Sequence, residues 1–234
     1  MTVRHQVHIL GIEPCGADIV TVRLSRPEGY TFIAGQWFTL TLSTDEGEET
    51  KTFSHCSAPS DTYLEMTTRL SGSSFKRALA ILAPGDRASI AGPGGRLILP
   101  DDAHRVCFLV GGVGITPVRS MLREVMHLGR EFETALLLYG NRDASCVPFL
   151  DELKRMSPLG VHTTVVYENP PHDWEGETGF ITAEMVRRHL EDRDSVLFFV
   201  AGPPVMVSVM ERVLEDLGVP KQRRRVERFG PIGS

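Results

Sequence analysis

The first hundred residues alternate hydrophobic and polar positions in short runs that are broken by turn residues. The runs are rich in β-branched side chains, and this alternation predicts strands with one buried face. These strands are expected at residues 19–27, 37–44, 50–57, 64–70 and 87–93. Short strands separated by turns such as "RPEGY" and "TDEGEE" indicate a small antiparallel β-barrel. Residues 73–82 have a helical period instead, with Ser73 as a candidate N-cap.

From about residue 105 the pattern changes to fully apolar runs that alternate with amphipathic segments. The apolar runs predict strands at 105–112, 134–141, 161–169 and 195–203, and a last strand is expected at 223–230. The amphipathic segments predict helices at 116–129, 147–156, 182–190 and 204–218. Buried strands that alternate with helices imply a parallel sheet covered on both faces. We therefore predict two domains: an antiparallel β-barrel over residues 1–100 and a doubly wound α/β domain over residues 101–234, with the boundary in Leu99–Arg105.

Three loops follow predicted strands of the second domain, where ligands of parallel sheets bind. They are "GGVGITP" (111–117), "YGNRD" (139–143) and "AGPP" (201–204). Glycine lets a bound group approach backbone N–H donors directly. The first loop is an incomplete G-x-G-x-x-G fingerprint, because Pro117 stands where the third glycine would be. The convergence of three loops on one edge is stronger evidence for a ligand site than any one of them.

Composition narrows the class of protein. A net charge of −5 over 234 residues argues against a general nucleic-acid binder. The four cysteines are too dispersed for an iron–sulfur cluster, so we interpret them as thiols in a reducing compartment. The histidines lack metal-ligand spacing, so no metal site is expected. The longest apolar stretch falls short of the ~18 residues of a membrane span. We expect a soluble, cytoplasmic protein.

Six short motifs follow one another along nearly the whole chain. They are "AGQWFTL" (34–40), "KTFSHCS" (51–57), "LAPGDRASIAGPGG" (82–95), "GGVGITP" (111–117), "AGPPVM" (201–206) and "ERFG" (227–230). In this order they resemble the motifs of the ferredoxin–NAD(P)H reductase family of flavoproteins. The resemblance implies a barrel that binds flavin, FAD in preference to FMN, followed by a domain that binds a nicotinamide nucleotide.

The resemblance also implies roles for residues of the barrel. Phe53 would pack on the flavin, and the hydroxyl of Ser54 would bond the flavin N5; otherwise both are ordinary strand residues. Lys51 replaces the usual phosphate-binding arginine, and Lys76 stands where a hydroxyl is common, so it either meets phosphate or is a solvated helix lysine. His55 is interpreted as structural. The implied flavin-binding residues are Lys51, Thr52, Phe53, Ser54, Thr67, Thr68, Arg69, Ser73, Ser74, Phe75 and Lys76.

In the family, a loop of the form G-G-x-G-x-T-P bends around the nicotinamide nucleotide. The three glycines would let the backbone approach the pyrophosphate, and Thr116 would lie near the nicotinamide. Ala201 replaces a cysteine that many members carry there. The implied nucleotide-binding residues are Gly111, Gly112, Gly114, Ile115, Thr116, Pro117, Asn141, Arg142, Gly202, Pro203, Pro204 and Met206. Arg142 could hold a 2′-phosphate, but Glu168 favours NADH. Glu227 and Phe229 would reach the flavin, with Glu227 a proton relay or a surface residue.

The resemblance therefore predicts an FAD-dependent NAD(P)H oxidoreductase. Hydride would pass from NAD(P)H to flavin N5, with Ser54, Thr116 and Glu227 as the catalytic residues. Electrons would then leave to a separate acceptor: a ferredoxin, a flavodoxin, an oxygenase component or free flavin. The basic residues Lys221, Arg223, Arg224, Arg225 and Arg228 either dock an acidic carrier or form a solvated face. The alternatives are an electron-relay subunit of a larger complex and a nucleotide-binding regulator without flavin.

Overall fold

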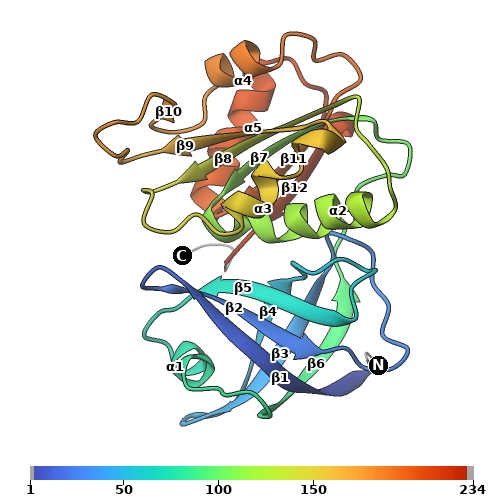
Figure 1. Ribbon diagram of the computed structural model, residues 1–234, viewed down its shortest axis with the longest axis vertical. Coiled ribbons are helices and arrows are strands. Elements are labelled where there is room, and N and C mark those ends of the chain that lie inside the picture. Colours follow the sequence, from blue (N-terminus) through green and yellow to red (C-terminus); the bar gives the residue numbers. More distant parts are fainter. Residues whose placement is uncertain (1–2, 231–234) are drawn as a thin grey trace. The chain divides into compact units, whose positions relative to one another are not determined.

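The computed structural model describes residues 3–230 and divides the chain into two compact units (Figure 1). The first unit contains the chain up to Ile98 together with the segment Thr116–Glu124. The second contains Leu99–Ile115 and the chain from Val125 onward. Each unit is built on one six-stranded sheet.

The sheet of the first unit is antiparallel and has the strand order β4-β3-β6-β1-β2-β5. Its strands are β1 (Arg4–Cys15), β2 (Ile19–Ser25), β3 (Trp37–Thr44), β4 (Gly47–Ser54), β5 (Tyr63–Arg69) and β6 (Arg87–Gly94). The first half of β1 pairs with β6 and its second half with β2, and the register shifts between Ile9 and Gly11. An irregularity of this kind bends a strand, which suits the barrel-like form of this sheet.

The core of this unit follows from the alternation seen in the sequence. Inward-facing side chains such as Val22, Phe38 and Leu64 are completely buried. The helix α1 (Ser74–Ala80) adds Phe75 and Leu79 to the same core. The predicted helix is confirmed, and so is its cap, because Ser73 accepts a hydrogen bond from the N–H of Lys76.

The sheet of the second unit is parallel and has the strand order β10-β9-β8-β7-β11-β12. Its strands are β7 (Arg105–Gly111), β8 (Thr134–Asn141), β9 (Val161–Tyr167), β10 (Glu177–Thr178), β11 (Leu197–Gly202) and β12 (Arg224–Arg228). The helices are α2 (Ile115–His127), α3 (Leu150–Lys154), α4 (Ala183–His189) and α5 (Pro204–Asp216), with the short 3₁₀ helices η1 (Gly112–Gly114), η2 (Ser157–Leu159) and η3 (Lys221–Arg223).

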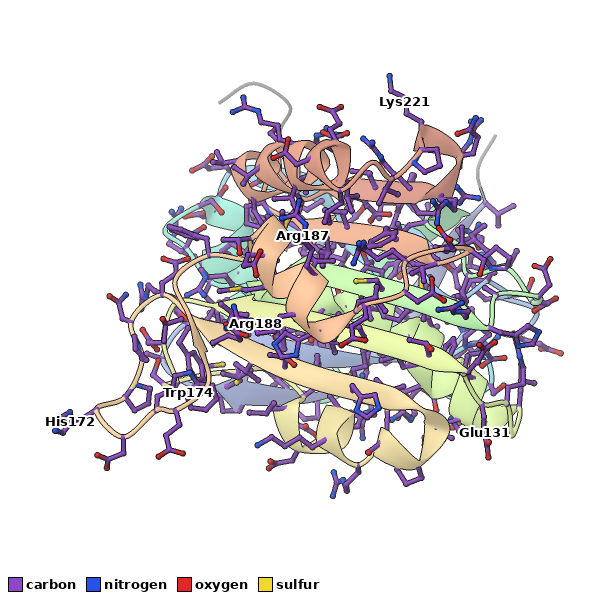
Figure 2. All side chains as sticks on the ribbon, turned by 90° about the horizontal axis from the view of Figure 1, so that it is seen from above. Glu131, His172, Trp174, Arg187, Arg188 and Lys221 are labelled. Atoms are coloured by element: carbon purple, nitrogen blue, oxygen red, sulfur yellow. The ribbon has the colours of Figure 1, made fainter. Side chains whose placement is uncertain are left out.

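Helices cover both faces of the parallel sheet, which explains why its strands are apolar throughout. Figure 2 shows α4 and α5 on one side of the sheet and α3 on the other. Side chains of α4 and α5, such as Val186 and Met210, pack with Leu109, Leu138 and Val200 of the strands. The predicted fold class, an antiparallel barrel-like sheet followed by a doubly wound parallel sheet, is confirmed.

The predicted elements differ from the observed ones mainly at their ends. The helix expected at 147–156 is only five residues long, because Phe149 takes a left-handed backbone conformation with φ 63° just before α3. β4 ends at Ser54, three residues before the end predicted for it. The 12-residue strand β1 and the two-residue strand β10 were not predicted.

The redox state of the cysteines differs from the prediction. Cys15 and Cys146 are disulfide-bonded, so the interpretation of all four as thiols is wrong for these two. Cys56 and Cys107 are free and buried, and burial raises the pKa of the Cys56 thiol to about 12. Between residues 3 and 230, no helix is both long and apolar enough to cross a membrane. In the same range, no cluster of potential metal ligands forms.

Candidate cofactor sites

The order of strands in the parallel sheet reverses at β7. β8 and β9 lie on one side of it, whereas β11 and β12 lie on the other. Open α/β sheets bind ligands at the carboxyl ends of the strands where the order reverses. The glycine loop follows β7 and the segment Gly202–Pro204 follows β11. The fold therefore brings two of the predicted nucleotide segments to the same crevice.

The three glycines of the loop are required for different reasons. A Cβ added at Gly114 would lie 2.2 Å from the carbonyl oxygen of Ala201, and one at Gly111 would lie 2.3 Å from the Sδ of Met206. These two glycines allow close packing against β11 and α5. Gly112 has φ +51° and nothing within 4 Å of an added Cβ. Of the three, Gly112 is thus the one whose backbone is open to an approaching phosphate.

Buried side chains of β8 hold the loop from its other side. The hydroxyl of Tyr139 donates to the carbonyl oxygen of Gly112 at 3.1 Å and to that of Pro148 at 3.3 Å. The side-chain amide of Asn141 donates to the carbonyl oxygen of Tyr139 at 3.2 Å. Asn141 is therefore engaged in ordering the end of the strand.

The other predicted nucleotide residues lie at the beginnings of two helices. Ile115 and Thr116 are buried in the first turn of α2, where Pro117 follows them. Pro203 precedes α5 and is exposed, whereas Pro204 and Met206 are half-buried in its first turn. Met206 fills the space above Gly111.

An acid beside Arg142 changes how that residue is interpreted. Arg142 Nε lies 3.0 Å from the Oδ2 of Asp143. Hydrogen bonds from Ser145, together with Arg142, lower the pKa of Asp143 to about 2. The N–H of Glu168 donates to the carbonyl oxygen of Asn141 at 3.0 Å, which places this second acid beside the end of β8. Asp143 was not singled out from the sequence, although its position next to Arg142 was a signal for it.

In the first unit, two lysines gather around a half-buried aromatic ring. Lys51 and Phe53 lie on the same face of β4, because they are two residues apart in a strand. The Nζ of Lys76, from α1, lies 4.8 Å from the centre of the Phe53 ring. Burial, and then the charge of Lys51, lower the pKa of Lys76 to about 8. Two ammonium groups beside an apolar ring are a donor set that fits an anionic aromatic ligand.

Most of the remaining residues predicted to bind flavin already have structural partners. Thr67 bonds the hydroxyl of Thr21 at 2.7 Å, Thr68 accepts a hydrogen bond from Lys76, and Arg69 pairs with Asp18. Ser73 caps α1, and the Ser74 hydroxyl donates to Glu49. The side chain of Phe75 is completely buried, and Thr52 is exposed on β4. Their roles toward a ligand stay predictions.

Ser54 and His55 lie at the end of β4 and point into different surroundings. Ser54 is buried and pairs in register with Trp37 of β3. His55 is completely buried, stacks on Phe32 with ring centres 3.8 Å apart, and its Nε2 lies 3.2 Å from the Tyr30 hydroxyl. Burial lowers the pKa of His55 to about 3, so the ring is neutral at ordinary pH. His55 is structural, as predicted.

The C-terminal strand β12 carries the last predicted site residues. Glu227 is half-buried and pairs with Ala201 of β11. The N–H of Phe229 donates to the carbonyl oxygen of Gly202 at 2.8 Å, so Phe229 lies beside a residue that is predicted to bind the nucleotide. In the basic cluster, Arg224 pairs with Glu215 and Arg228 with Glu211. Two positive charges of the basic cluster are therefore already paired with glutamates of α5.

Comparison with known proteins agrees with this arrangement. Residues 108–212 match the family model of the oxidoreductase NAD-binding domain. One component of the Na⁺-translocating NADH-quinone reductase of Idiomarina loihiensis is 30% identical over 156 residues, which cover 64% of this chain and 38% of that protein. The NADH-cytochrome b5 reductase 1 of Aspergillus terreus is 30% identical over 158 residues, 64% of this chain and 53% of that protein. The chain thus spans about half the length, or less, of these curated relatives.

The solved structures extend the likeness to both units. The ferredoxin NADP⁺ reductase of Neisseria gonorrhoeae, solved with bound FAD and NADP, has the same fold with a TM-score of 0.84 at 24% identity; the match covers 96% of this chain and 98% of that one. The chain therefore has the fold of the ferredoxin reductases, and its residues 108–212 match the oxidoreductase NAD-binding domain. These matches support the family resemblance that the order of the motifs indicated.

The sequence analysis did not identify one buried group of charged residues. Arg119 of α2 is buried and its Nη1 lies 2.8 Å from the Oε2 of Glu65 on β5. Arg23 of β2 bonds the other oxygen of this carboxylate at 2.7 Å. These residues hold the segment Thr116–Glu124 to the barrel-like sheet of the first unit, and their separation in the sequence hides the pairing.

Proposed function

We propose that the chain is an FAD-dependent NAD(P)H reductase that passes electrons to a separate acceptor. The observation that carries the proposal is the open backbone of Gly112, in a loop of an NAD-binding domain where the strand order reverses. The first unit supports the proposal as well, because the ring of Phe53 with Lys51 and Lys76 could bind an anionic aromatic cofactor.

Each unit would bind one cofactor: the second unit the nicotinamide nucleotide and the first unit the flavin. In the second unit, Gly112 would receive the nucleotide pyrophosphate, and Tyr139 fixes the loop that presents it. In the first unit, Phe53 would pack against the flavin while Lys51 and Lys76 supply positive charge. Ser54, Thr116 and Glu227 remain proposed as the residues at the reacting atoms. When bound, FAD accepts a hydride from reduced nicotinamide and releases electrons singly or in pairs.

The acceptor is proposed to be a separate molecule, such as a ferredoxin, a flavodoxin, an oxygenase component or free flavin. The relatives' names specify different acceptors, cytochrome b5 and quinone. One of these relatives is part of a larger complex, which keeps a second candidate open, namely an electron-relay component without independent activity.

We further propose that NADH is preferred over NADPH. A 2′-phosphate needs an available cation, whereas Arg142 is already paired with Asp143 and Glu168 lies beside the same strand end. We expect Asp143→Asn to remove this pairing and to raise the ratio of kcat/KM for NADPH over NADH about tenfold. Glu131→Gln, which removes an exposed carboxylate from another loop of the same unit, should leave the ratio unchanged.

Steady-state oxidation of NADH and NADPH with ferricyanide as acceptor tests both proposals at once. The FAD-supplemented wild-type chain should turn over, with NADH the better substrate. Turnover with an artificial acceptor distinguishes a reductase from a relay component, because a relay component would bind flavin and leave both nucleotides unoxidised. A wild-type preference for NADPH, or an unchanged ratio in Asp143→Asn, would contradict the assignment of nucleotide choice.

A further inference from the structure

Lys76 holds a half-buried ammonium group in an apolar setting. It extends from α1 over the ring of Phe53, at 4.8 Å from its centre, and lies 5.9 Å from the centre of the Phe75 ring. Its one hydrogen-bond partner among the residues that the structure describes is the hydroxyl of Thr68, which is uncharged. Nothing in the packing of the barrel requires a charge at this position, since the neighbouring rings are already part of a continuous core.

The carboxylates near Lys76 are bound to other groups. Glu49 of β4 accepts from Ser74 and lies 3.6 Å from the Nζ of Lys51. Asp45 of the β3–β4 hairpin pairs with Arg77 at 2.8 Å, with Glu46 at 3.6 Å from the same guanidinium, and Asp18 pairs with Arg69 beside β5. Within residues 3–230, no carboxylate lies within ion-pair distance of Lys76 itself. The charged group that lowers the pKa of Lys76 is a second cation, Lys51.

This arrangement disfavours the charged form of Lys76 as long as the site holds no anion. Burial acts first and the repulsion from Lys51 second, and together they bring the pKa to about 8. A lysine with this pKa is about nine-tenths protonated at pH 7 and about one-tenth at pH 9. An anion bound between the two lysines would reverse the effect, because it stabilises both ammonium groups.

We infer that Lys76 is a proton-linked binding residue for the flavin, one that takes up a proton from solvent when the anionic cofactor occupies the site. The inference rests on the proposed FAD-dependent function. It assigns to Lys76 a task that a hydroxyl at this position could not perform, since a hydroxyl binds phosphate equally well on both sides of pH 8.

The sign of the resulting pH dependence follows from linkage. Flavin raises the pKa of Lys76 above its value of about 8 in the flavin-free protein. The contribution of Lys76 to binding is therefore fully present below pH 8 and is lost as the pH rises toward the pKa of the complex. The affinity for FAD should fall about tenfold between pH 7 and pH 9, in proportion to the protonated fraction of the free protein.

Calorimetric titration of the flavin-free chain with FAD tests the inference. Runs at pH 7 and pH 9, each in two buffers with different heats of ionisation, measure the affinity and the number of protons taken up. The wild type should take up close to one proton per FAD at pH 9 and almost none at pH 7. Lys76→Arg should bind with little change between the two pH values, because arginine is protonated throughout.

Two further variants separate the charge of Lys76 from general effects. Lys76→Met should bind FAD weakly at both pH values and without proton uptake, and its flavin-free form should melt no lower than wild type, since a buried charge has been removed. Arg77→Met is the matched control, because Arg77 lies on the same helix, is exposed and is paired with Asp45. It should keep the proton uptake of wild type.

The outcomes distinguish this inference from the proposed function. FAD binding with an affinity that is equal at pH 7 and pH 9, or with proton uptake that persists in Lys76→Met, would overturn the inference and leave the function standing. Failure of the wild type to bind FAD at either pH would overturn the proposed function itself.

Discussion

Replacing Glu65 with glutamine should lower the free energy of unfolding by about 3–5 kcal/mol, since it removes the carboxylate shared by a buried ion pair. The side chain of Glu65 is 2% exposed and that of Arg119 is 7% exposed. The substitution removes this carboxylate from the buried guanidinium of Arg119, whose Nη1 also donates to the carbonyl oxygen of Cys56 at 2.7 Å. Urea unfolding followed by circular dichroism measures the change.

Two comparisons show whether the buried charge is the cause. The double variant Glu65→Met with Arg119→Met should recover much of the loss, because a buried ion pair can be replaced by apolar side chains of similar volume. Asp45→Asn, which breaks an exposed pair with Arg77, should change the free energy of unfolding far less than Glu65→Gln does. A loss in Glu65→Gln no larger than in Asp45→Asn would show that the pair contributes little to the first unit.

Replacing Gly114 with valine should destabilise the second unit by about 3 kcal/mol, at the upper end of the usual cost of overpacking. Even the Cβ would lie 2.2 Å from the Ala201 carbonyl oxygen and 2.9 Å from the Cα of Gly202. Both are backbone atoms of β11, which is hydrogen-bonded on both sides and does not yield as a flexible side chain would. Thermal unfolding should show the loss in the absence of any nucleotide.

Gly112→Val is the matched substitution in the same loop. The added Cβ meets no protein atom within 4 Å, and the positive φ should cost about 1–2 kcal/mol. The side chain does occupy the open space from which a phosphate would approach, so we expect the affinity for NADH to fall while the fold is kept. If Gly112→Val binds NADH as wild type does, the nucleotide does not lie over this part of the loop.

The fold was predicted from the sequence because the pattern of hydrophobic residues is strong in both halves of the chain. It changes once, from the alternation of half-buried strands to apolar strands separated by amphipathic helices. The apolar strands β7, β8 and β11 and the long helices α2 and α5 were each expected within a few residues of their ends. The 12-residue strand β1 was missed, and short elements were missed for physical reasons. β10 has two residues, too few for a period, and the start of α3 depends on a backbone conformation of Phe149 that its residue type does not suggest.

The candidate sites were predicted in part. The glycine loop was expected at a strand end, but the sequence could not distinguish Gly112 from Gly111 and Gly114, because the distinction depends on β11 and α5 lying beside the loop. The pairing of Arg119 with Glu65 joins residues 54 positions apart. Lys76 was expected to face solvent or phosphate, and only the fold shows the ring of Phe53 beneath it. Spatial neighbours of this kind leave no local signal.

An anaerobic visible spectrum tests the central claim most directly. The purified chain is supplemented with FAD, freed of unbound flavin, and recorded before and after one equivalent of NADH and, separately, of NADPH. The account predicts that the protein retains its flavin and that NADH bleaches the flavin absorbance faster than NADPH does. A protein that retains no flavin, or a retained flavin that neither nucleotide bleaches, would contradict it.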